Sequence, residues 1–254
     1  MEKIDTILAY KNSLKIIQDK DAYSYSIDSC LLSFFIKLKK KEKGIIDLGT
    51  GSGAIPLYLS MFTKSKIYGV EIQEDASIRA KRSVELNKLT NQIEILNMDI
   101  KDLPEIFPKH SFSIVVSNPP YFRLNDTALK NANPSLLIAR HEVLINMEDI
   151  IKVASYLLID GGSINLVQKT DRFLETLELL NNYRLTPKRV RFVYPKMKKD
   201  SYIFLIEAVK NAPTHGFKIE EPLYIYNEKS EYSKEVLEYF HYGEENEEIK
   251  RIYK

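Results

Sequence analysis

The segment Asn118-Pro119-Pro120-Tyr121 carries the most specific chemical signal in this sequence. The exocyclic amine of an adenine is a poor nucleophile because its lone pair is delocalised into the ring. The side-chain oxygen of Asn118 and the carbonyl of Pro119 could each accept one amine hydrogen and aim the lone pair at a methyl donor. The prolines stiffen the loop, and Tyr121 offers a flat face on which an extruded base stacks. We therefore predict a catalytic loop for amine methylation, with an ordinary Pro-Pro turn beside a core tyrosine as the structural alternative.

A glycine-rich turn, Gly49-Thr50-Gly51-Ser52-Gly53, follows a short apolar run that ends near Asp47. Glycines permit positive φ and let a ligand approach the backbone closely. With Ala54 and Glu71 the turn also fits the dinucleotide-binding fingerprint, so the turn alone leaves a nicotinamide oxidoreductase open. Asp47 favours a methyl donor, because its carboxylate would repel a pyrophosphate but could approach the amino-acid end of S-adenosylmethionine through a water.

Two further acids end predicted strands, where the ligand of an open α/β sheet is expected. Glu71 would accept hydrogen bonds from two ribose hydroxyls, and Asp99 from the amino group of the cofactor adenine. Ordinary surface acids are the alternative for either one alone. We expect S-adenosylmethionine as the cofactor, held by residues of this edge: Asp47, Gly49, Gly51, Gly53, Glu71, Ile72, Asp99, Ile100 and Asn118.

Positions 188 to 199 hold six basic residues and no acid: Lys188, Arg189, Arg191, Lys196, Lys198 and Lys199. Phe192 and Tyr194 are interleaved with them. This pattern indicates contact with RNA phosphates, and a solvated charged face is the alternative. The formal net charge of +2 is too balanced to indicate a nucleic-acid partner by itself.

Alternating strands and helices must position these residues. Apolar runs predict strands at 45–48, 66–72, 93–98, 112–117 and 163–168, and a close pair at 189–194 and 202–209. Helical patterns cover 54–62, 75–89, 147–159 and 171–181. An earlier helix is predicted with Asp28 as its N-cap, and Gly161-Gly162 is predicted to end the helix at 147–159. The fold class is therefore α/β, a Rossmann-like, doubly wound and mostly parallel seven-stranded sheet with an antiparallel edge strand.

We expect a single methyltransferase domain over residues 1–254: a helical or irregular N-terminal extension at 1–43, the Rossmann-like core at 44–210 and a C-terminal extension at 211–254. The 44% hydrophobic content suits such a domain. One cysteine, Cys30, excludes an intramolecular disulfide, and the four histidines show no zinc-ligand spacing. We accordingly expect no metal, no membrane and a cytoplasmic location.

Together these motifs resemble the bacterial tRNA1(Val) adenine-N6 methyltransferases, from about Asp19 to the C-terminus. The segments that carry the resemblance are Tyr25-Ser26-Ile27-Asp28-Ser29, Asp47–Gly53, Gly69-Val70-Glu71-Ile72-Gln73, Asn118–Tyr121, Ile138-Ala139-Arg140-His141-Glu142 and Pro187–Lys196. The resemblance implies methylation of the exocyclic N6 of the adenine beside the anticodon, with the anticodon stem-loop of a valine tRNA as partner. Separately, the polar loop at 122–139 is long for a passive connection, and we expect it to close over the substrate as a lid.

Other substrates stay open, because an amide nitrogen poses the same geometric problem as an adenine amine. The wider class of amino-group methyltransferases includes glutamine methyltransferases of release factors and adenine methyltransferases of DNA or rRNA. Only 43 residues precede the core, which is short for the helical N-terminal domain of the release-factor enzymes. No insertion is large enough for the target-recognition domain of the DNA enzymes. We therefore expect tRNA.

Overall fold

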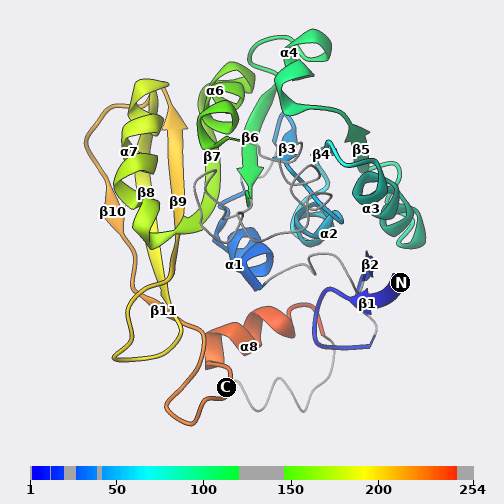
Figure 1. The fold of residues 1–254 in the computed structure, drawn as a ribbon, viewed down its shortest axis with the longest axis vertical. Coiled ribbons are helices and arrows are strands. Elements are labelled where there is room, and N and C mark those ends of the chain that lie inside the picture. The colour runs from blue at the N-terminus through cyan, green and yellow to red at the C-terminus, as the bar shows by residue number, and fades with distance from the viewer. Residues whose placement is uncertain (1, 12, 20–26, 39–41, 120–145, 245–254) are drawn as a thin grey trace, which may run out of the picture.

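A central, mostly parallel sheet organises the chain (Figure 1). The computed structural model describes residues 2–11, 13–19, 27–38, 42–119 and 146–244. Within them the spatial order of strands is β10 (Lys218–Ile219), β8 (Leu185–Tyr194), β9 (Ile203–Lys210), β7 (Leu158–Lys169), β6 (Phe112–Ser117), β3 (Ile45–Leu48), β4 (Ile67–Glu71) and β5 (Ile93–Asn97), with β11 (Leu223–Tyr224) also beside β8. The predicted α/β fold class is confirmed.

The antiparallel strand lies at a different position in the sheet from the one predicted. β9 is antiparallel to both β7 and β8, whereas the other neighbours in this sheet are parallel. The antiparallel strand therefore lies inside the sheet, between β7 and β8, and the two-residue strands β10 and β11 extend the edge beyond β8. These additions make the sheet nine-stranded, not seven-stranded.

Helices cover both faces of the sheet and enclose two cores. Their bounds are α1 (Ile27–Phe35), α2 (Ala54–Ser60), α3 (Glu74–Leu86), the 3-10 turn η1 (Ile100–Asp102), α4 (Leu103–Ile106), α6 (Met147–Leu157), the 3-10 turn η3 (Thr170–Arg172), α7 (Phe173–Asn182) and α8 (Lys234–Phe240). One core packs α1, α2 and α3 against the sheet through side chains such as Leu31 and Leu57. The other packs α6 and α7 through Ile150 and Leu180. No helix in the described ranges is long and apolar enough to cross a membrane.

Two local predictions are corrected by the structure. α1 begins at Ile27, so Asp28 is a buried residue of its first turn and not the N-cap. Gly161 and Gly162 do not follow the end of a helix, because they lie inside the long strand β7. A Cβ on Gly162 would lie 2.9 Å from the backbone oxygen of Ser113, so a glycine lets β7 approach β6 at an irregular register.

The N-terminal segment forms an antiparallel strand pair that the sequence pattern did not predict. The strands β1 (Glu2–Thr6) and β2 (Lys15–Asp19) pair along their length. β2 docks on α3, where the Ser83 hydroxyl accepts from the Ile17 amide at 2.9 Å. The Asn87 side chain also binds the backbone of Lys15: its oxygen accepts from the Lys15 amide at 2.8 Å, and its nitrogen donates to the Lys15 carbonyl at 2.6 Å. The strand pair is thereby anchored to the core.

Candidate active site

The carboxyl ends of β3, β4 and β6 meet at one edge of the sheet. β3 is parallel to both of its neighbours, so Asp47, Glu71 and Asn118 are brought to the same edge, as predicted. In Figure 1 the arrow of β6 points towards this edge, where α1 and α8 lie. The hydroxyl of Ser117 donates to the Leu48 backbone oxygen at 2.7 Å and ties the ends of β6 and β3 together.

The glycine turn adopts a conformation that its residue types require. Gly49, Gly51 and Gly53 all have positive φ, of 77°, 56° and 84°. The amides of Gly49 and Thr50 both donate to the Val70 oxygen at 2.9 Å, which fixes the turn against β4. The turn leads directly into α2, so its backbone is available as a cradle at the start of that helix.

Gly69 of β4 lies directly against Thr50 of this turn, and the sequence pattern assigned it no role. A Cβ at this position would lie 2.9 Å from the Thr50 hydroxyl and 2.8 Å from the Ile95 Cδ1 atom. Both distances are shorter than real Cβ contacts, so a side chain would displace the turn or strand β5. A glycine inside a predicted strand was the available signal, because it marks a close approach of another segment.

Asp47 is the most unusual group at this edge. Its side chain is fully buried, and neither carboxylate oxygen has a hydrogen-bond partner. Burial raises the pKa of Asp47 to about 7; the nearby Thr50 hydroxyl opposes this shift and the Glu71 charge reinforces it. Leaving a buried carboxylate unpaired costs free energy unless a ligand supplies donors. The orphaned oxygens beside the glycine cradle therefore fit a cofactor with a cationic or hydrogen-bond-donating end.

Glu71 fastens the glycine turn to β4. One carboxylate oxygen accepts from the Gly51 amide at 2.8 Å and the other from the Gln73 amide at 2.9 Å. Burial raises the pKa of Glu71, and these amide hydrogen bonds offset part of the increase. Ile72 follows it half-buried, and its carbonyl accepts from the Asn97 side chain at 3.1 Å. The predicted contact of Glu71 with ribose hydroxyls stays a prediction.

Asp99 and Ile100 begin the turn η1 after β5. The Asp99 carboxylate caps this turn by accepting from the Lys101 amide at 2.9 Å, and it pairs with the Lys101 Nζ at 3.1 Å. Ile100 is buried in the core under α6. Asp99 and Ile100 thus place a carboxylate next to an apolar side chain, which suits a flat ring with polar groups at its edge. Their contact with the adenine of the cofactor stays a prediction.

Asn118 lies directly after β6 and is oriented by α1. Its side-chain nitrogen donates to the Ser29 hydroxyl at 3.1 Å. With the amide nitrogen used in this way, the amide oxygen is the atom that can accept from a substrate amine. Pro119 is buried next to it. Ser29 was missed as a positioning residue. Pro120, Tyr121 and the proposed lid at 122–139 lie outside the described residues, as do Arg140 and His141.

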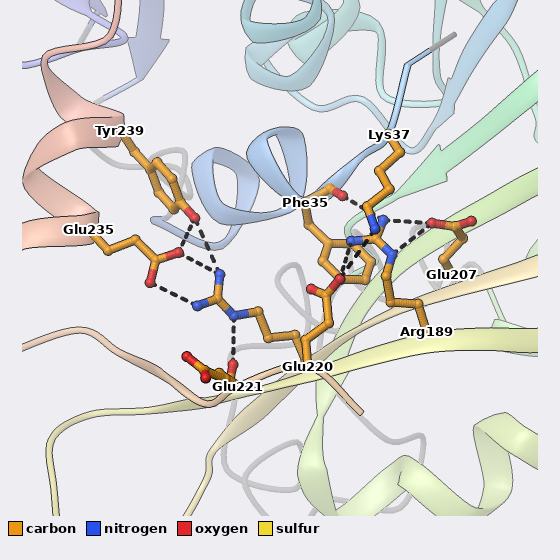
Figure 2. A network of polar contacts seen from close by, with 9 residues as sticks. Phe35, Lys37, Arg189, Glu207, Glu220, Glu221, Glu235 and Tyr239 are labelled. Carbon is orange, nitrogen blue, oxygen red and sulfur yellow. Dashed lines mark hydrogen bonds and ion pairs between the residues drawn. The ribbon is translucent and has the colours of Figure 1, made fainter. Parts of the chain in front are cut away.

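Arg189 belongs to the fold and not to an exposed RNA surface (Figure 2). Its guanidinium donates to a Glu207 oxygen at 2.6 Å and to a Glu220 oxygen at 3.1 Å. It also donates to the backbone oxygen of Phe35 at 2.7 Å and lies 3.7 Å from the centre of that ring. Only 7% of the side chain is exposed, and four of the five guanidinium N–H donors are used within the chain. The structure contradicts the predicted RNA contact of Arg189.

Arg191 and Lys188 are also engaged within the chain. Arg191 forms a two-point pair with Glu235 of α8 at 2.6 and 2.8 Å and donates to the Glu221 carbonyl at 2.9 Å, which tethers α8. The Lys188 ammonium donates to the His215 carbonyl at 2.7 Å. Both residues hold the C-terminal extension against β8, and their predicted phosphate contacts stay predictions.

The three remaining lysines lie together in the loop between β8 and β9. Lys198 and Lys199 are exposed and Lys196 is half-buried. Within the described part of the chain, none of these three side chains has a hydrogen bond or ion pair in the structure. They keep the predicted role in RNA contact as a proposal. The same part of the chain contains no group of three or more potential metal-ligating side chains.

Comparisons with known proteins agree with this geometry. The sequence model described as methyltransferase small domain matches residues 13–193. A tRNA1(Val) (adenine(37)-N6)-methyltransferase of Trichodesmium erythraeum is 32% identical over 171 residues, which are 65% of this chain and 70% of that protein. One of Cytophaga hutchinsonii is 26% identical over 182 residues, 72% of this chain and 75% of that protein.

Solved structures share the fold. A predicted O-methyltransferase of Agrobacterium tumefaciens superposes with a TM-score of 0.67 at 21% identity, covering 84% of this chain and 95% of that one. The geranyl diphosphate C-methyltransferase of Streptomyces coelicolor A3(2), solved with S-adenosyl-L-homocysteine, superposes with a TM-score of 0.53 at 12% identity, covering 72% and 77%. This chain therefore shares the fold of both proteins.

Proposed function

This chain belongs to the methyltransferase small domain family and uses S-adenosylmethionine, and from that premise we propose that its substrate is the N6 amine of an adenine in tRNA. The observation that carries the proposal is Asn118, oriented by Ser29 at the end of β6 and beside the glycine turn. The names of the relatives support the finer statement that the target is the adenine next to the anticodon of a valine tRNA.

The residues at the sheet edge fit the cofactor. The two unpartnered oxygens of Asp47 would hold its amino-acid end, and the turn from Gly49 to Gly53 would let it approach the backbone. Glu71 would take the ribose, while Asp99 and Ile100 would take the adenine ring. Bound there, S-adenosylmethionine would supply the methyl group of its sulfonium. The group that leaves is a neutral thioether, which needs no acid from the protein.

Asn118 and Pro119 act on the substrate amine. The Asn118 side-chain oxygen and the Pro119 carbonyl accept the two amine hydrogens, which moves electron density onto the nitrogen and fixes the direction of its lone pair. Pro120 and Tyr121 complete this loop by stiffening it and stacking on the base. The methylated amine then gives up its proton to water, so we assign no catalytic base.

The remaining proposals concern the whole chain. We treat residues 1–254 as a single methyltransferase domain whose N-terminal strand pair and C-terminal extension both pack on the core. Lys196, Lys198 and Lys199 would bind phosphates of the tRNA. A cytoplasmic location follows from the proposed tRNA substrate and the single cysteine, Cys30.

Methyl transfer to total bacterial tRNA tests this function. Labelled S-adenosylmethionine is incubated with the protein and tRNA, and the tRNA is digested to nucleosides. We expect label in N6-methyladenosine, and a loss of roughly 10²–10³-fold in rate for Asn118→Ala, as for removal of one preorganised polar contact at a reacting atom. Ser29→Ala should reduce the rate by only about 2- to 12-fold, since it removes one positioning hydrogen bond.

The unfolding midpoint of each variant controls for its fold. Label in a release factor, with none in tRNA, would reject the tRNA substrate and keep the amine chemistry. Equal rates for wild type and Asn118→Ala on tRNA would reject the catalytic assignment itself.

A further inference from the structure

The loop between β8 and β9 lies at the same sheet edge as Asn118. β9 is antiparallel to both β7 and β8, so the carboxyl end of β8 is on the same side as the carboxyl ends of β7 and β6. The C-terminal extension covers this loop closely. The Ile225 amide donates to the Tyr194 oxygen and the Tyr226 amide to the Pro195 oxygen, both at 2.9 Å. Two distant parts of the chain thus build one surface beside the active edge.

Exposed aromatic rings lie on this surface. Tyr226 and Tyr232 stack on each other with centroids 5.2 Å apart and an interplanar angle of 24°, and a backbone bridge joins the same two residues. They expose 38% and 39% of their area, and Tyr202, at the start of β9, exposes 37%. The pair is held from behind by Phe240 of α8, whose ring meets Tyr232 edge-on at 5.0 Å. The rings are therefore fixed in place while one side remains open to solvent.

Tyr202 connects this pair with the active edge. Its amide donates to the Val193 oxygen and its carbonyl accepts from the Thr170 amide, both at 3.1 Å. Val193 is near the carboxyl end of β8, and Thr170 directly follows β7. Tyr202 therefore lies on the side of the sheet where β6 ends and Asn118 follows.

The same loop supplies positive charge. Lys196, Lys198 and Lys199 are unpaired, as described above, and Asp200 is the single acid between them and β9. Lys198 has a φ of 64°, and the Lys199 amide donates to the Lys196 oxygen at 3.2 Å, so the three lysines lie within one tight turn. Flat rings next to a cluster of cations match a single strand of nucleic acid, whose bases stack while its phosphates are neutralised.

We propose that Tyr202, Tyr226 and Tyr232 form a stacking surface for the unpaired bases that flank the target adenine, with Lys196, Lys198 and Lys199 on the phosphates of the same strand. This inference rests on the proposed function and adds to it the place where the RNA strand leaves the active site. The three lysines favour RNA over a protein partner, because lysine is depleted at protein–protein interfaces.

Binding of a fluorescein-labelled anticodon stem-loop RNA, measured by anisotropy, tests the surface. Tyr226→Ala and Tyr232→Ala should each raise Kd by about 5- to 100-fold, as expected for the loss of one stacked base, while Tyr226→Phe should bind as the wild type does. Phe217→Ala is the matched control. Phe217 is a similarly exposed aromatic, at 42%, but it precedes β10, which pairs with the middle of β8 at Arg189 and Val190, away from the β8–β9 loop. Its Kd should not change.

A reporter variant separates stacking from a purely structural role. The protein contains no tryptophan, so Tyr226→Trp introduces the sole indole. A stacked base should quench its fluorescence when RNA is added, and binding of S-adenosylhomocysteine alone should not. This variant keeps an aromatic ring at the site, so it answers the question even if an alanine variant fails to fold.

Turnover of the wild type on tRNA distinguishes the two levels of proposal. If the wild type methylates tRNA but the alanine variants bind RNA as tightly as it does and the indole is not quenched, the stacking surface is rejected and the function stands. If the wild type neither binds nor methylates tRNA, both are rejected. If the alanine variants instead lose activity on a protein substrate, the surface belongs to a protein partner and the RNA assignment is overturned.

Discussion

Two regions of this molecule carried the functional predictions, and the structure treats them differently. The turn from Gly49 to Gly53 and the strand ends around it come together at one sheet edge, as their spacing indicated, because backbone geometry determines their positions. The basic segment from Lys188 to Lys199 is divided. Its strand residues are engaged within the fold, Lys188 with a backbone carbonyl and Arg189 and Arg191 with glutamates, whereas its loop lysines are unpaired within the described residues.

The difference lies in what decides the role of a residue. A glycine with positive φ between a strand and a helix is determined by its immediate neighbours, which are visible in the sequence. An arginine on a strand has its role determined by whatever packs against it, and Glu207 and Glu235 are 18 and 44 residues away from their arginines. Backbone-encoded sites are thus predictable from spacing, whereas charge clusters require the tertiary partners. The following changes test that contrast, in order of decreasing effect.

Asp47→Asn should have the largest effect, with opposite signs on stability and on binding. The folded-state pKa of Asp47 is about 7 against an ordinary 3.8, so the folded state binds the proton more tightly than the unfolded state. Stability contributed by this group is then greatest below pH 4 and falls as pH rises towards 7. At pH 8 the neutral variant should be more stable by up to about 4 kcal/mol, at 1.36 kcal/mol per pKa unit.

Urea unfolding at pH 8 and pH 4 measures this difference, which should vanish at the lower pH. Calorimetry with S-adenosylhomocysteine should show that the more stable variant binds the cofactor far more weakly. Unchanged cofactor affinity would show that the orphaned carboxylate serves the fold alone, and the contrast between the two regions would then fail at its strongest point.

Arg189→Ala should destabilise the fold by about 3 kcal/mol, since it leaves Glu207 poorly compensated in a largely buried setting. Chemical denaturation measures this. At a temperature where the variant is folded, its affinity for tRNA should match that of the wild type. Weak tRNA binding by a variant of unchanged stability would restore the sequence interpretation of Arg189 as a phosphate contact.

Gly69→Ala should cost about 1–3 kcal/mol, because its Cβ would be forced against Thr50 and Ile95. Affinity for S-adenosylhomocysteine should fall with it, since Thr50 belongs to the glycine turn. Gly216→Ala is a suitable control: its φ is also unfavourable for a side chain, at 83°, but its Cβ would meet nothing within 4 Å. The control should lose stability without losing cofactor affinity.

The fold was predictable where one strong periodic signal decides an element. β3 and β6 lie at the predicted bounds, because strands buried on both faces read as short continuous apolar runs. The strands β10 and β11 were not predicted, since each has only two residues, too few for a periodic pattern. β1 and β2 were missed because their polarity is mixed: Ile16 and Ile17 are buried, whereas the residues of β1 are largely exposed.

The residues of the candidate site likewise include some that the sequence predicted and some that it did not. The positions of Asp47, Glu71 and Asn118 followed from the alternation of strands and helices, as parallel strands end at one edge. Ser29 could not be predicted as the partner of Asn118, because 89 residues separate them and a serine in a helix carries no distinguishing signal. Asp28 was assigned to a cap for the same reason: its buried environment is created by elements far along the chain.

The smallest effect on stability, and the clearest separation of the two kinds of basic residue, is expected for the exposed lysines. Lys198→Ala combined with Lys199→Ala should change the free energy of unfolding by less than about 0.5 kcal/mol, since neither side chain is paired in the described structure. Each lysine that neutralises a phosphate contributes roughly 0.7 to 0.9 to the slope of log affinity against log salt, so the double variant should lower the slope for tRNA by up to about 2. Filter binding between 50 and 200 mM salt, roughly the range over which such slopes are read, measures this. Arg189→Ala should do the opposite: it should reduce the free energy of unfolding and leave the salt slope for tRNA unchanged. A slope that falls for Arg189→Ala and not for the lysines would reverse the assignment of the whole segment.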